Sequence, residues 1–319
     1  MPHLPTARQV ISIASGAALS FSVFAAPRSQ AVEFHFGWKP GMACDVVNTI
    51  ALHSTDRGEQ SMELHYVLKA SPAQNGEILI HAENPQAKPG NTGSFVDASL
   101  AKMLTMANAP PFRVKATGEY SGLDDFEGAR KNLRDAFVKF QPKPLDQKKL
   151  DQMIESVATR GLFDQAAKMF WTPAISMWSG ASLEKQVPVD FESSSAMPIG
   201  KPIEVKFKMK AEMMSLATCT RQELSRQCAG LRATGTADPE TVKAGVLSML
   251  STAGAKLDSD TRFDVVESKT VYEVSTEPDT LVPHRVRTER TTTARGLDHG
   301  KPMEYFSVES REWVLACRG

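Results

Sequence analysis

The sequence predicts an α+β fold in which a curved antiparallel β-sheet, or more than one, is covered on one face by an inserted block of about three amphipathic helices. Residues 32–121 and 185–316 consist of short segments of alternating polar and apolar side chains between Gly, Pro and Asn-Gly turns, a pattern typical of antiparallel strands. Residues 122–178 instead repeat apolar side chains at helical spacing. The chain of 319 residues is 41% hydrophobic, which is enough to bury a sizeable core.

Residues 1–31 are predicted to be a secretory signal peptide, which leaves residues 32–319 as the mature β-rich domain. Arg8 precedes an apolar run over residues 10–26 that is diluted with Ser and Gly, and cleavage is expected after Ala26 or Ala31. A membrane anchor is the alternative, but the run is shorter than the ~20 strongly apolar residues that span a bilayer. We therefore expect an exported protein, periplasmic or, as the alternative, extracellular.

The charge balance argues against several classes of partner. Lys plus Arg and Asp plus Glu number 37 each, so the mature chain has no basic field for nucleic acid and no polybasic membrane patch. No later segment is apolar enough to span a membrane. No phosphate-binding or dinucleotide-binding motif is present, and no cofactor is expected.

Four cysteines in an exported chain predict two disulfides. Cys219 and Cys228 flank a short polar stretch, which suits a clamp across a hairpin, and pairing of Cys44 with Cys317 would tie the two ends of the chain together. A redox or metal-binding thiol pair is the alternative for Cys219 and Cys228. No Cys-x-x-Cys occurs and no histidine is near them in the sequence, so we expect structural disulfides.

The first β region is predicted to contain five strands, one short helix and two well-marked turns. Lys39-Pro40-Gly41 has the residues of a type II turn, and Asn75-Gly76 is a strong hairpin signal. Residues 86–93 read as a loop and residues 97–109 as a short helix. The expected strands are residues 32–38, 44–52, 62–68, 77–82 and 112–120.

In the helical block, Asp124 is the expected N-cap of the first helix, with Glu127 completing a capping box. A second helix is expected over residues 146–160, ended by Gly161, and a third over 162–171, ended or kinked by Pro173.

The second β region is predicted to contain seven strands and one helix. Asp238-Pro239-Glu240 supplies the cap, proline and acidic residue of a helix start, and that helix is expected to reach residue 253. The expected strands are residues 186–192, 203–209, 213–220, 228–236, 262–275, 282–294 and 303–315.

Few residues point to catalysis or metal binding. His53, His65 and His81 lie on separate strands of the first meander, at different heights, so we expect surface histidines and no metal site. Ser193-Ser194-Ser195 has no local base, and Asp124, Asp125 and Glu127 crowd a helix start, where carboxylates serve as caps. We expect no catalytic residue, although a site assembled from distant residues is left open.

Methionine and aromatic residues in the helices are the candidate ligand-binding residues. Such side chains provide adaptable apolar surface that suits a lipid, another apolar ligand or a partner protein. The alternative is core packing against the sheet, which the apolar stripe of each helix favours. The candidates are Met153, Met169, Phe170, Trp171 and Trp178.

Several short motifs resemble a group of uncharacterised bacterial exported proteins, known as domains of unknown function. They are Phe36-Gly37-Trp38-Lys39-Pro40-Gly41, Phe112-Arg113-Val114 followed by Gly118-Glu119-Tyr120, and the segment from Glu277 to Pro283 before the last two strands. The resemblance covers most of the mature chain and implies no activity. At fold level the layout is similar to periplasmic lipoprotein carriers and related half-barrels, which implies an apolar cavity beneath helices.

These observations predict an exported, non-enzymatic protein of the cell envelope that binds an apolar ligand, such as a lipid, or an envelope protein between helices and sheet. Two alternatives remain open from the sequence: a hydrolase with a non-local site, and a purely structural or assembly protein.

Overall fold

The computed structural model describes residues 31–55, 58–89, 110–140, 146–196, 203–219, 226–252, 262–298 and 300–318. The expected signal peptide up to residue 30 and the short helix expected at residues 97–109 lie outside the described residues.

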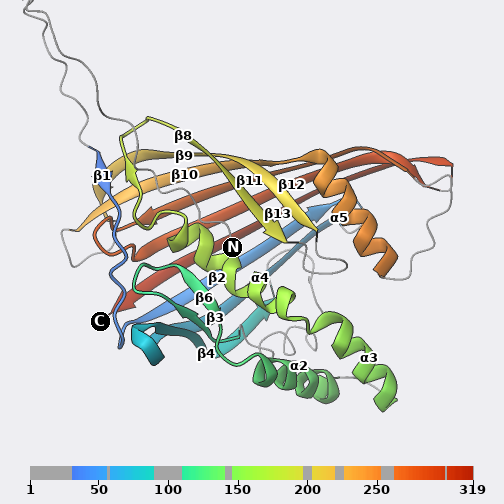
Figure 1. The fold of residues 1–319 in the computed structure, drawn as a ribbon, viewed down its shortest axis with the longest axis horizontal. Helices are drawn as coiled ribbons and strands as arrows, with labels where there is room; N and C mark the ends of the chain where they lie inside the picture. Colours follow the sequence, from blue (N-terminus) through green and yellow to red (C-terminus); the bar gives the residue numbers. More distant parts are fainter. Residues whose placement is uncertain are drawn as a thin grey trace, which may run out of the picture.

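Eleven strands of the described chain form one open, curved antiparallel sheet in the order β6-β5-β4-β3-β2-β13-β12-β11-β10-β9-β8 (Figure 1). The predicted α+β class is therefore confirmed. The strands are β2 (Ala43–Ser54), β3 (Gly58–Pro72), β4 (Ile78–Pro89), β5 (Phe112–Val114), β6 (Tyr120–Leu123), β8 (Val189–Ala196), β9 (Glu204–Thr218), β10 (Gln227–Ala237), β11 (Arg262–Thr276), β12 (Pro283–Asp298) and β13 (Lys301–Arg318). A separate two-stranded pair joins β1 (Val32–Glu33) to β7 (Ser182–Leu183).

The pairing of β2 with β13 joins the two β regions into one sheet. It runs without a register shift from Ser54 opposite Ser307 to Ala43 opposite Arg318, and the pair before the last, Cys44 with Cys317, is disulfide-bonded. Cys219 and Cys228 form the second disulfide, at the loop end of the β9–β10 hairpin. Both cysteine pairings considered from the sequence are thus present.

The helices are α2 (Phe126–Phe140), α3 (Gln147–Val157), α4 (Arg160–Trp171) and α5 (Pro239–Thr252). Asp125, and not Asp124 as expected, caps α2, because its Oδ1 accepts a hydrogen bond from Gly128 N at 2.8 Å. The expected end of the second helix at Gly161 is also wrong. Thr159 caps α4 through Leu162 N, so Gly161 lies in the first turn of α4. None of the helices in the described part of the chain is long and apolar enough to cross a membrane.

Several expected elements differ in the structure. The strands expected at residues 203–209 and 213–220 are one continuous strand, β9, and the loop expected at residues 86–93 is wrong up to Pro89, where β4 ends. Of residues 32–38, Val32 and Glu33 form β1, while Phe34 and Gly37 bond through backbone N–H groups to Ala181 O and Thr280 O. Residues 112–120 are divided into β5 and the start of β6 by a turn in which Gly118 has a φ of +81°. That left-handed conformation is one that glycine adopts at little cost, and the turn positions the hairpin against α4.

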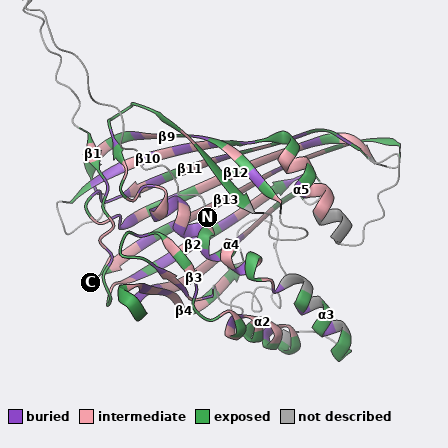
Figure 2. Ribbon diagram, viewed as in Figure 1, coloured by how far each residue is buried: buried purple, intermediate pink, exposed green. Residues whose placement is uncertain are grey.

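The core lies between the sheet and α4. Figure 2 shows buried residues concentrated in the central strands and in α4. Proline at position 173 has no N–H to donate, and the helical backbone continues past it as a π-helical turn, Thr172–Ser176. This turn carries three more buried residues, Pro173, Ala174 and Ile175, so the expected end of the third helix is a change of helix type.

Candidate functional site

Three of the candidate ligand-binding residues are core residues. Phe170, Trp171 and Trp178 are 9%, 0% and 1% exposed and belong to the main hydrophobic cluster, and Met169 is half-buried against it. Met153 lies on α3, and the structure does not describe its side chain.

The Trp171 ring is enclosed by other aromatic rings. Its centroid lies 5.9, 5.3 and 5.5 Å from those of Phe36, Trp38 and Phe112, each pair edge-to-face, the arrangement that aromatic quadrupoles favour. Its Nε1 donates to Gly118 O at 2.8 Å. The indole ring is therefore packed against other rings and its N–H has a hydrogen-bond acceptor, as expected of a core residue.

We call the face of the large sheet that carries Trp313 the inner face. Both α4 and α5 cover it. Phe170 of α4 packs on Trp313 with 5.6 Å between ring centroids. Farther along β13, Tyr305 and its neighbour Ala294 pack with Val242, Val246 and Leu247 of α5. At ~3.4 Å per residue, the eight residues from Tyr305 to Trp313 separate these two contacts by ~27 Å along the strand.

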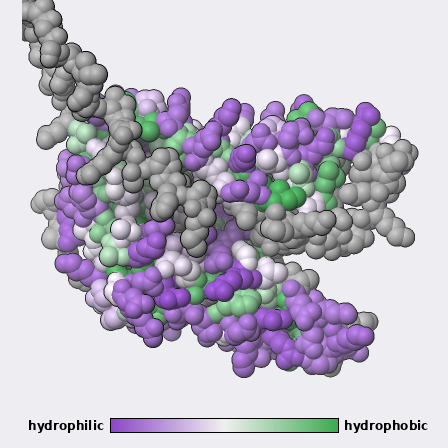
Figure 3. All heavy atoms as spheres, viewed as in Figure 1, coloured by the Kyte–Doolittle hydropathy of each residue, from purple (hydrophilic) through white to green (hydrophobic). Residues whose placement is uncertain are grey.

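The inner-face strip between the two helices comprises three opposed pairs of β2 and β13: Ser54 with Ser307, Leu52 with Glu309, and Ile50 with Arg311. Directly opposed residues of antiparallel strands share a face. Ile50 also opposes Met62 of β3. With Leu64, these two residues form a small hydrophobic cluster separate from the main core. Figure 3 shows the molecule hollowed between the α2–α3 pair and the end of the sheet that carries α5.

Two buried polar atoms of β2 have no hydrogen-bond partner among the described residues. Asn48 is 6% exposed and Ser54 is 3% exposed, and both Asn48 Oδ1 and Ser54 Oγ are unpaired. Both side chains are on the inner face, because they lie two and four residues from Ile50 along the strand and therefore point to the same side. An unsatisfied buried polar group costs about 1–3 kcal/mol and calls for a specific explanation, such as a bound water or ligand.

Two further polar groups lie at the α4 end of this strip: Arg311, in the strip pair nearest Trp313, and Tyr66, which opposes Val46 on the same face. Burial raises the pKa of Tyr66 well above its usual range, and the neighbouring Trp313 indole and Arg311 oppose this shift only in part. The phenol therefore stays protonated. Arg311 forms an ion pair with Glu309 at 2.7 Å, with the two side chains 24% and 34% exposed. The strip thus offers apolar surface beside hydrogen-bonding and charged groups.

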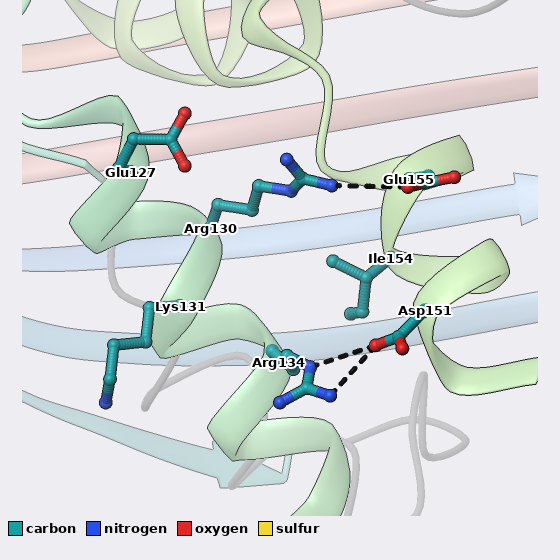
Figure 4. Close-up of a pocket in the computed structure, with 7 residues that line it drawn as sticks. All are labelled: Glu127, Arg130, Lys131, Arg134, Asp151, Ile154 and Glu155. Carbon is teal, nitrogen blue, oxygen red and sulfur yellow. Dashed lines mark hydrogen bonds and ion pairs between the residues drawn. The ribbon is translucent and has the colours of Figure 1, made fainter. Parts of the chain in front are cut away.

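A second hollow lies between α2 and α3 and has a volume of about 350 Å³. Figure 4 shows Arg130 and Arg134 of α2 pointing toward Glu155 and Asp151 of α3. Arg134 Nη2 lies 2.9 Å from Asp151 Oδ1, and Arg130 lies 4.0 Å from Glu155. Its lining comprises Glu127, Arg130, Lys131, Arg134, Asp151, Ile154 and Glu155. The three basic and three acidic side chains compensate one another, so this hollow has no excess charge for an ionic ligand.

The residues weighed for catalysis have other contacts in the structure. Ser194 donates to Glu204, and Asp124 forms an ion pair with Arg113 at 3.6 Å. His53, His65 and His81 each lie beside a glutamate. In the described part of the chain these three histidines do not form a group of potential metal ligands.

One residue near the cysteines was missed by reasoning from the sequence. His284, at the start of β12, lies within 4.8 Å of both sulfurs of the Cys219–Cys228 disulfide, measured between ligand atoms. The expectation that no histidine is near this pair holds along the chain but is wrong in space. No local signal could have found it, because 56 residues separate Cys228 from His284.

Comparisons with known proteins identify no family for the chain. No protein-family model matches it, and no curated protein matches it significantly. Among solved structures, it is similar to lipovitellin, in a structure describing lipid–protein interactions, with a TM-score of 0.40 and 9% identity over 88% of this chain. It is also similar to an outer membrane channel from Pseudomonas putida F1, with a TM-score of 0.17 and 9% identity over 88% of this chain and 98% of the channel. The chain spans about a quarter of the lipovitellin chain, at 26% coverage. Both likenesses are too distant to carry an argument about function.

Proposed function

We propose that this protein is an exported binding protein of the cell envelope, and that its inner face between α4 and α5 holds an amphiphilic ligand with an apolar chain and a polar group. The observation that carries the proposal is the pair of unpartnered atoms, Asn48 Oδ1 and Ser54 Oγ, on either side of the buried Ile50. A ligand hydroxyl, amide or bridging water would satisfy them, while its chain would lie against the half-buried Leu52 and Leu64 of the same face.

The aromatic core residues and the residues of the inner-face strip have different roles in this proposal. Phe170 packs on Trp313 and forms the end wall of the strip. Trp171 and Trp178 have no exposed surface to offer, so they hold α4 in place. Arg311 lies beside Ile50 on the strip, and its ion pair with Glu309 offers hydrogen-bonding groups to a polar head group.

Export is supported by the two disulfides, because such bonds persist in oxidising compartments such as the periplasm or the cell exterior. We propose that cleavage after Ala26 or Ala31 releases residues 32–319 as the mature domain. Its proposed location is the periplasm, with the cell exterior as the alternative.

The test uses the mature chain purified without detergent. Native mass spectrometry should detect a bound amphiphile, and a fluorescent fatty acid should bind and be displaced by lipid extract. Leu64→Arg places a charge on the inner face within the apolar cluster and should weaken probe binding at least tenfold. Val314→Arg is the matched control, because Val314 is 38% exposed and alternates with Trp313 onto the opposite face of β13.

Two results would contradict the proposal. One is a mature chain that carries no amphiphile and does not bind the fluorescent fatty acid. The other is equal probe affinity in the Leu64→Arg and Val314→Arg variants, which would show that binding does not involve the inner face.

A further inference from the structure

A compact group of metal-binding side chains lies at the end of the β9–β10 hairpin, away from the inner-face strip. The sulfurs of Cys219 and Cys228 and a ring nitrogen of His284 are all within 4.8 Å of one another. The two cysteines are 8% and 5% exposed, and the His284 side chain is 23% exposed. The cluster is therefore partly shielded, with access from solvent on the histidine side.

Glu277 holds the histidine in this position. Its carboxylate is 8% exposed and accepts hydrogen bonds from Arg226 Nη1 at 3.0 Å to each oxygen and from Thr280 Oγ1 at 2.9 Å. It also lies 3.2 Å from His284 Nε2. A carboxylate acceptor favours the proton on Nε2, so Nδ1 carries the free lone pair. A carboxylate behind a histidine is the usual outer partner of a metal-ligating imidazole.

We propose that reduction of the Cys219–Cys228 disulfide creates a binding site for a thiophilic divalent cation of the Zn²⁺ class, with Cys219, Cys228 and His284 as ligands and Glu277 as the positioning residue. Two thiolates and one imidazole are a ligand set that Zn²⁺ accepts, and three protein ligands leave the fourth position for water or another molecule.

The geometry permits this change with little movement. A tetrahedral Zn²⁺ with bonds of ~2.3 Å to sulfur and ~2.0 Å to nitrogen holds its donor atoms roughly 3.5–3.8 Å apart. The three donors already lie within 4.8 Å. The backbone also keeps the cysteines together without the disulfide, because Cys219 N bonds to Arg226 O at 2.9 Å and Thr218 pairs with Gln227.

The chemistry balances with a dithiol as the reductant. The disulfide takes up two electrons and two protons and becomes two thiols, while the dithiol loses the same and becomes a disulfide. Cation binding then releases the two thiol protons, because thiolates are the ligands. The cation thus binds the reduced form and is excluded from the oxidised form.

The test reduces the mature chain anaerobically with a water-soluble phosphine and titrates it with Co²⁺, followed by displacement with Zn²⁺. The reduced protein should bind Co²⁺ with thiolate-to-cobalt absorption, and the oxidised protein should not. His284→Gln should weaken Co²⁺ binding at least tenfold, and Glu277→Gln should weaken it about 10–100-fold. Cys219→Ser leaves the Cys228 thiolate as the only sulfur ligand of this site, so it should reduce the thiolate absorption and weaken Co²⁺ binding at least tenfold.

His81→Gln is the matched control for the histidine. His81 Nε2 is also 3.2 Å from a glutamate oxygen, and its side chain is 22% exposed, but it is not in the cysteine group. The His81→Gln variant should bind Co²⁺ with the same affinity as the unsubstituted chain. Equal affinity in the two histidine variants, or equal binding by the oxidised chain, would overturn the proposal.

A folding measurement covers the case in which reduction destabilises the protein. If circular dichroism shows that the reduced chain has lost its sheet, Zn²⁺ should restore the signal in the unsubstituted chain and in His81→Gln, and not in His284→Gln. Failure of Zn²⁺ to restore it would also overturn the proposal.

Discussion

Replacing Trp171 distinguishes a core residue from a ligand-lining residue. Its side chain is fully buried, and an aromatic side chain of this kind buries about 150–250 Å². At ~25 cal/mol per Å² this corresponds to roughly 4–6 kcal/mol, and truncations of buried aromatics typically cost about 3–5 kcal/mol. We therefore expect Trp171→Ala to lower the free energy of unfolding of the ligand-free protein by about 3–5 kcal/mol.

Trp171→Phe separates packing from hydrogen bonding. The ring is retained and only the Nε1 donor to Gly118 O is lost. Ser176 Oγ also donates to Gly118 O, at 3.1 Å, so this carbonyl keeps a partner and the expected loss is about 1 kcal/mol plus the smaller ring's lost contact.

Urea unfolding followed by far-ultraviolet circular dichroism measures both changes without relying on tryptophan fluorescence. Val138→Ala is the control, because Val138 is 60% exposed on α2 and should change stability by less than about 0.5 kcal/mol. A loss below about 1 kcal/mol for Trp171→Ala would refute the reasoning, since it would mean that the ring lines a space and does not fill one.

Three further predictions concern single residues. Asp125→Ala should lower the free energy of unfolding by about 1 kcal/mol, because it removes the cap of α2, whereas Asp124→Ala should cost less than about 0.5 kcal/mol for its exposed ion pair; equal effects in urea unfolding would contradict the assignment. Gly118→Ala should cost about 1–3 kcal/mol, since φ is +81° and a Cβ would lie 2.8 Å from a phenylalanine ring; an unchanged thermal midpoint would argue against this turn. The hydrogen bond from Lys69 lowers the pKa of Glu83. The contribution of this pair to stability is therefore present at neutral pH and is lost as the pH falls through the lowered pKa. In the Lys69→Met variant, an NMR titration should give a higher pKa for Glu83 than in the unsubstituted chain, and an unchanged pKa would exclude the pairing.

Much of the fold followed from local signals in the sequence. Asn75 and Gly76 both have positive φ, as the hairpin between β3 and β4 requires. Asp238 Oδ1 accepts from Thr241 N at 2.9 Å, so α5 begins where its cap and proline predicted. Such features depend on a few adjacent residues, and a sequence states them directly.

The remainder depended on contacts between distant residues. The Asn48 and Ser54 side chains look like ordinary strand residues, and only the pairing of β2 with β13 places them on a covered face. His284 meets the cysteines because the β11–β12 turn folds against the hairpin end. The cap of α2 also depended on the structure, because Asp124 and Asp125 are adjacent acids and the sequence does not show that Asp125 accepts the hydrogen bond from the helix.

The position of β13 has a consequence for the order in which the molecule is made. Lys301–Arg318 lies between β2 and β12, so during synthesis one edge of β2 stays unpaired until β13, which is distant in the sequence, has been made. Contacts of such long sequence separation form slowly, and an unpaired strand edge is a site for aggregation in the meantime. The protein should therefore depend on a factor that shields the edge of β2 until β13 pairs with it.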